Sequence, residues 1–123
     1  MPDDVAAVFA AWRATRPRPK LCKLTTARRK QISKALQDYT AADLLALIRY
    51  ANQAQTAEAR FWRGENDRGQ EYLDLMNLLR ISKLDGRIER AILWAEGQAS
   101  EAAAEAAGVD LGPMGLLRGM GEA

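Results

Sequence analysis

Four carboxylates lie close together near the middle of the chain, at Glu65, Asp67, Glu71 and Asp74. Runs of this kind hold Mg²⁺ in nucleases and Ca²⁺ in loops. A calcium loop needs oxygen ligands at alternate positions and a final bidentate acid, whereas here arginines at positions 63 and 68 are interleaved with the acids. No Gly-Lys-Ser/Thr follows, which excludes a phosphate loop. We therefore expect no metal and no cofactor, and a magnesium-dependent nuclease built on these acids is the enzyme alternative.

The commonest general base and metal ligand is missing, because the sequence contains no histidine. This absence removes every Ser-His and Cys-His nucleophilic arrangement. The one cysteine, Cys22, cannot form an internal disulfide, which suits a reducing compartment. We expect a protein that is not an enzyme.

The acids belong to a short polar segment, Gly-Glu-Asn-Asp-Arg-Gly, at positions 64–69. Gly64 and Gly69 permit positive φ, while Asn66 and Asp67 favour turns through side-chain to backbone hydrogen bonds. The pattern predicts a capped turn between two packed helices. Either Asn66 or Asp67 is expected to cap a following helix that contains Tyr72.

Helical periodicity accounts for most of the remaining chain. Alanine is abundant and β-branched residues are sparse, which favours an all-α fold. We expect helices over residues 4–15, 26–37, 41–52 and 56–63, one with Tyr72, Leu75, Met76 and Leu79 on its inner face, and one that opens at Ser82. Trp12 and Trp94 fall on apolar faces and are expected in the core. The two prolines in residues 16–20 predict an extended, exposed connection.

Together these segments predict a compact bundle of five to six short helices with a Gly-rich C-terminal tail. Residues 1–97 would form the helical domain, and residues 98–123 an Ala-rich helix and a Gly/Met/Leu-rich tail through which copies could associate. The helices over 26–37 and 41–52 are joined by residues 38–40, so we expect a tight pair resembling a helix-turn-helix in outline.

Charge is unevenly distributed along the chain. Residues 1–34 carry nine basic and two acidic side chains, a net +7, whereas the other residues carry nine basic and fourteen acidic ones, a net −5. Such a split indicates a polyanionic partner, the alternative being a solvated basic face. The helix over 41–52 is too apolar to read bases, so we expect contact with the DNA phosphate backbone only. The candidate nucleic-acid-binding residues are Arg16, Arg18, Lys20, Lys23, Arg28, Arg29, Lys30 and Lys34.

A second candidate surface surrounds the turn at 64–69. Phe61 and Trp62 precede it. Either both rings close the core over the turn, or one lies in the core and the other is partner-facing or partly buried. The candidate partner-binding residues are Trp62, Arg63, Glu65, Arg68 and Arg80.

No apolar run is long enough to span a membrane, and the first four residues lack the features of a secretory signal. The expected location is the cytoplasm.

Three segments in the same order carry a resemblance to a known family. They read LTTARRKQISKALQDYTAADLLALIRYA, FWRGENDRGQEYLDLMNLLR and ISKLDGRIERAILWA. This order is similar to the C-terminal helical module of phage and prophage replication proteins of the replisome-organiser or replication-initiator type. The matching positions include Thr25, Arg28, Arg29, Tyr39, Thr40, Asp43, Gly64, Glu65, Asn66, Gly69, Tyr72, Asp74 and Arg80.

The resemblance implies a non-catalytic role in phage DNA replication inside a bacterial host, in which the module holds DNA, a helicase or a helicase loader. The winged-helix domain usual in that family is not found in this sequence, so origin recognition is not implied. The alternative is a small phage or mobile-element protein that binds and regulates a host complex or transcription without touching DNA.

Overall fold

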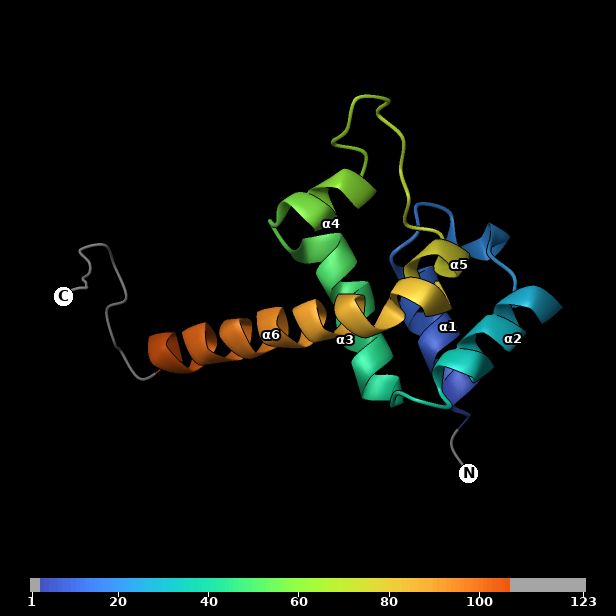
Figure 1. Cartoon of the computed structure of the whole chain (residues 1–123), viewed down its shortest axis with the longest axis horizontal. Coiled ribbons are helices and arrows are strands. Elements are labelled where there is room, and N and C mark those ends of the chain that lie inside the picture. Colours follow the sequence, from blue (N-terminus) through green and yellow to red (C-terminus); the bar gives the residue numbers. More distant parts are fainter. Residues whose placement is uncertain (1–2, 107–123) are drawn as a thin grey trace. The chain divides into compact units, whose positions relative to one another are not determined.

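The computed structural model describes residues 3–106, with side chains as far as residue 98. Within that range the chain forms six α-helices, one 3₁₀ turn and no strand (Figure 1), which confirms the all-α prediction. The elements are α1 (Asp4–Ala14), η1 (Pro19–Leu21), α2 (Thr26–Ala35), α3 (Ala41–Gln53), α4 (Ala57–Trp62), α5 (Leu75–Leu78) and α6 (Ile81–Ala106). The Gly-rich tail lies outside the described residues.

The chain divides into two units, residues 1–92 and residues 93–123. The first holds α1 to α5 and the start of α6, and all contacts discussed below lie within it. The Ala-rich segment expected as a separate helix continues α6 without a break as far as Ala106. The proposed domain division at residue 97 stays a prediction. None of the helices in the described range is both long and apolar enough to cross a bilayer.

Four helices begin where the sequence predicts, because each start is fixed by a local side-chain hydrogen bond. The side chains of Asp3, Thr25, Thr40 and Thr56 each accept a backbone N–H from the first turn of α1, α2, α3 and α4. At α3 the carboxylate of Asp43 also accepts the backbone N–H of Thr40, which completes a capping box.

The core is centred on α3, whose residues Leu44, Leu47 and Ile48 are fully buried. This helix packs against α1, α4 and α5, whereas α2 packs against α1 and α5 and hardly touches α3. The expected tight pairing of α2 with α3 is therefore wrong. Helix α2 ends at Ala35, so that residues 36–40 form a longer connection, and only Ile32 and Ala35 give it a buried face.

The helix expected around Tyr72 is replaced by an irregular segment and a single turn. Helix α5 begins only after Asp74, which caps it by accepting the backbone N–H of Asn77. The N–H of Tyr72 instead donates to the carbonyl of Trp62 at 2.7 Å. As a result Met76 is 40% exposed, and the buried set is Leu73, Leu75, Leu78 and Leu79.

Two further expectations differ from the structure in detail. Helix α6 begins at Ile81, one residue before the expected cap at Ser82, and its buried residues are Leu84, Ile88 and Ala91. The segment with two prolines is exposed as expected, but it is not fully extended. Its second proline starts the 3₁₀ turn Pro19–Leu21, where a proline at the first position costs no hydrogen bond.

Candidate functional site

Six solvent-exposed cations lie on α2 and on the segment that leads into it. Within residues 3–98 none of the six is ion-paired with a carboxylate. Helix α2 contains no acidic residue that could neutralise them. We call this set the basic surface; it consists of Arg18, Lys20, Lys23, Arg29, Lys30 and Lys34.

The helical period explains why α2 presents these charges. Ile32 and Ala35 point into the core, so positions on the opposite side of the helix must face solvent. Lys30 and Lys34 are one turn apart on that side, which separates them by about 6 Å along the helix axis. Their side chains therefore project in the same direction, as a polyanion-binding face requires.

Two of the expected DNA-binding residues, Arg16 and Arg28, make contacts within the fold. The guanidinium of Arg28 lies 4.9 Å from the centroid of the Trp12 ring and donates to the carbonyl of Lys23 at 2.7 Å. Arg16, whose side chain is 12% exposed, pairs with Glu71 at 2.8 Å. The basic surface therefore excludes both arginines. At Arg28 the reason is position, since it shares the inner side of α2 with Ile32 and Ala35.

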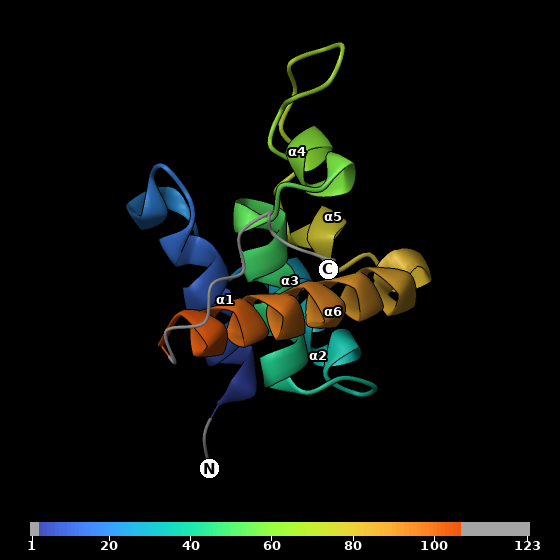
Figure 2. The ribbon, with the colours of Figure 1, turned by 90° about the vertical axis from the view of Figure 1, so that its left-hand side faces the viewer.

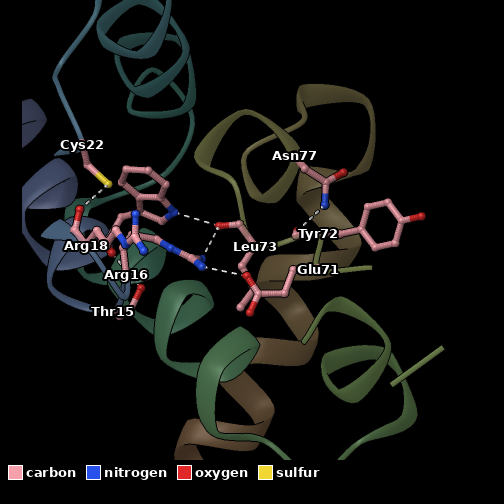
Figure 3. A network of polar contacts seen from close by, with 9 residues as sticks. Thr15, Arg16, Arg18, Cys22, Glu71, Tyr72, Leu73 and Asn77 are labelled. Carbon is pink, nitrogen blue, oxygen red and sulfur yellow. Dashed lines mark hydrogen bonds and ion pairs between the residues drawn. The ribbon is translucent and has the colours of Figure 1, made fainter. Parts of the chain in front are cut away.

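Arg16 belongs to a network that joins the end of α1 to residues 71–73 (Figure 3). The carbonyl oxygen of Leu73 accepts a hydrogen bond from Nε1 of Trp12 at 2.8 Å and another from Arg16 at 3.3 Å. The side-chain amide of Asn77 donates to the carbonyl of Tyr72 at 2.8 Å. These bonds fix the irregular segment that precedes α5.

The second candidate surface is a loop of residues 63–74 that projects away from α4 in both views (Figures 1 and 2). Asn66 organises the loop: its amide donates to the carbonyls of Phe61 and Gln70, and its side-chain oxygen accepts the backbone N–H groups of Arg68 and Gln70. The segment is therefore a projecting, internally bonded loop rather than a tight connector between packed helices.

Both glycines of this loop have positive φ, as expected: 102° at Gly64 and 60° at Gly69. We expect Gly69→Val to lower the free energy of unfolding by about 1–2 kcal/mol, because a β-branched residue is strained in the left-handed region. Gly69→Asn should cost less, since asparagine tolerates that region. Urea denaturation of both variants measures the difference, and equal stability of Gly69→Val and the parent would contradict it.

The aromatic pair before the loop is divided between core and surface. Trp62, a candidate partner-binding residue, is only 5% exposed and makes an edge contact with Tyr50. The ring that reaches the surface is Phe61, which is 48% exposed and stacks on Tyr72. Helical geometry explains why Trp62 is buried and Phe61 is exposed, since Trp62 lies on the same side of α4 as the buried Ala59.

The other candidate partner-binding residues have different environments. Arg63 is half-buried and donates to the carbonyl of Ala51 at 3.2 Å. Glu65 pairs at 3.0 Å with Arg60 on the surface. Arg68 and Arg80 are exposed.

The four carboxylates that opened the question of metal binding do not form one site. Glu71 pairs with Arg16, Asp74 caps α5 and Glu65 pairs with Arg60. Over the stretch with described side chains, no group of three or more acids or cysteines could hold a metal ion. The arrangement therefore offers ion pairs, a helix cap and a loop surface.

One polar cluster, which links α4 to α6, was not predicted from the sequence. Arg90 donates to both carboxylate oxygens of Glu58, at 2.8 and 2.6 Å, and the hydroxyl of Tyr50 donates to the same carboxylate at 2.9 Å. Gly86 lies one turn before Arg90, and a Cβ there would stand 3.0 Å from a guanidinium nitrogen. Because 32 residues separate the two charges, local spacing could not reveal this pair.

Burial by itself raises the pKa of Glu58, but the hydrogen bonds from Arg90 and Tyr50 and the charges of Arg90 and Arg87 together lower it below 4.5. A lowered pKa stabilises the fold above the unfolded-state pKa, and this contribution is lost as the pH falls through the folded-state value. Glu58→Gln should therefore cost up to about 1 kcal/mol at neutral pH and less below pH 4.5. Denaturation at both pH values measures it, with Glu89→Gln, an exposed α6 carboxylate, as the control; a cost independent of pH would contradict the assignment.

Comparisons of this chain with models of protein families, with curated proteins and with solved structures found no match.

Proposed function

We propose that this protein is a non-catalytic module of phage-type DNA replication that holds the DNA phosphate backbone through its basic surface. The observation that carries the proposal is the set of six exposed cations on α2 and the preceding segment, which no carboxylate neutralises within residues 3–98. Cations of this kind release counterions from DNA, which supplies most of the free energy of sequence-independent binding.

The chemistry of the basic surface supports contact with phosphates rather than with bases. Bases are read mainly through bidentate hydrogen bonds, guanine by arginine or lysine and adenine by asparagine or glutamine, so cations alone could read only guanine. The one amide on α2, Gln31, already donates to the carbonyl of Leu79 at 2.6 Å. The helix that follows, α3, directs Leu44, Leu47 and Ile48 into the core. We therefore propose binding without sequence preference.

A replication helicase or its loader is the proposed protein partner, on the strength of the family resemblance alone. On the same basis we place the protein in the cytoplasm of a bacterial host. Association of copies through the C-terminal tail is proposed from the Met and Leu residues of that tail. The rival function is regulation of a host complex without DNA contact. It is favoured by the projecting loop of residues 63–74 and by the exposed ring of Phe61, which lies near the end of α4 just before the loop.

Binding to a random-sequence DNA duplex, measured by fluorescence anisotropy over a range of salt concentrations, tests the proposal. The logarithm of the binding constant should fall linearly with the logarithm of the salt concentration. The slope should reach about −5 if all six cations contact phosphates, and be shallower if fewer do. A binding constant that does not change with salt would exclude backbone contact. The DNA should remain uncleaved when magnesium is added, and cleavage would instead support the nuclease alternative.

A further inference from the structure

A surface pocket of about 440 Å³ lies against the projecting loop, on residues that the basic surface does not include. The side chains of Phe61 and Tyr72 contribute its aromatic part. Residues 65–68 of the loop line the remainder, and bring two carboxylates, one amide and one guanidinium.

The aromatic part of the pocket is a preformed stack. The rings of Phe61 and Tyr72 are nearly parallel, at 8°, with centroids 5.4 Å apart. About half of the Phe61 side chain is exposed to solvent, because Phe61 lies outside the buried side of α4 formed by Ala59 and Trp62. An aromatic face carries negative electrostatic potential and attracts a cation placed over it.

One carboxylate of the pocket can meet a cation. Glu65 is paired with Arg60 at 3.0 Å, whereas Asp67 has no ion pair within residues 3–98. The remaining polar side chain, Asn66, is fully engaged with the loop backbone and has no hydrogen-bonding group left to read a base. A cation placed over Phe61 meets an aromatic face and the carboxylate of Asp67.

The loop is also held in place before any ligand arrives. Its two ends are joined by the hydrogen bond from Tyr72 to the carbonyl of Trp62, and its interior is fixed by Asn66. A loop that is already ordered loses little conformational entropy on binding.

We propose that this pocket receives an arginine side chain of a partner protein. A guanidinium is planar, so it can stack on the open face of Phe61 while its N–H groups donate to Asp67. A lysine ammonium has the charge but not the plane, and fits less well. This site shares no residue with the basic surface, so it does not depend on DNA binding.

The test is an NMR titration of the full chain with N-acetyl-arginine methylamide, monitored through backbone amide resonances. N-acetyl-citrulline methylamide is the matched control, because it has nearly the same shape without the charge. The arginine probe should shift the resonances of residues 61, 65–68 and 72, with an affinity about fivefold or more above that of the citrulline probe. Uridine monophosphate tests the competing ligand class.

Two variants keep the result interpretable. Phe61→Ala should abolish the shifts, and Asp67→Asn, which leaves the aromatic stack intact, should reduce the affinity for the arginine probe to that for the citrulline probe. Equal shifts with both probes, shifts confined to other residues, or tighter binding of uridine monophosphate would each overturn the proposal.

Discussion

Replacing Arg29, Lys30 and Lys34 together by glutamine should weaken binding to a random-sequence duplex by about two orders of magnitude at about 0.1 M salt. Each phosphate contact contributes about −0.9 to the slope of log K against log salt, so the triple variant should also flatten the slope by about 2.7. These side chains are exposed and lie opposite the buried face of α2, so the fold should not change. Anisotropy at several salt concentrations measures both quantities.

The matched control removes the same charge from another part of residues 1–92. Arg68, Arg80 and Lys83 are also exposed, and their replacement by glutamine should reduce affinity only slightly through the smaller net charge. If the two triple variants lose affinity equally, net charge and not a basic surface governs binding. If the parent itself does not bind, the proposed function fails and the control becomes irrelevant.

Trp12→Ala should cost about 3–5 kcal/mol of unfolding free energy, the usual range for emptying a buried tryptophan site. Trp12 is 3% exposed, packs beside Phe9 with ring centroids 5.9 Å apart, and lies under the guanidinium of Arg28. Since the free energy of unfolding of small domains is about 5–15 kcal/mol, this loss would remove a large share of the stability of the fold. Urea denaturation checks it. Leu21→Ala, at a residue 70% exposed, is the control and should have little effect.

Trp12→Phe separates packing from hydrogen bonding at the same site. The variant keeps an aromatic ring but loses the bond to the carbonyl of Leu73, which then keeps, among the described residues, the bond from Arg16 at 3.3 Å. We expect a loss of about 1–2 kcal/mol and faster amide exchange in residues 71–74, near the lost anchor. A Trp12→Ala loss below about 1 kcal/mol would contradict the structural role assigned to this residue.

Features determined by neighbouring residues were predictable from the sequence. Thr25, Thr40 and Thr56 cap helices because each oxygen reaches a backbone N–H only three residues away. The positive φ values of Gly64 and Gly69 follow from the turn residues between them. Such interactions span few residues, so their spacing is visible in the chain.

Features determined by distant residues were not predictable in this way. Trp12 and Arg16 donate hydrogen bonds to the carbonyl of Leu73. The segment around Tyr72, expected to be helical, is therefore irregular. The same network holds the side chain of Arg16 against Glu71 and Leu73. In each case the deciding contact spans 55 or more residues, so no local pattern could reveal it.

The hydrogen bond between Tyr72 and Trp62 has a consequence for how this protein could change over time. It closes residues 63–71 into a loop whose two ends are held together whatever the sequence at its tip. Lengthening a closed loop costs entropy only as the logarithm of its length. Insertions beyond Asn66 could therefore accumulate with little effect on the core, so that partner recognition at the tip could diverge while the helices that carry it stay the same.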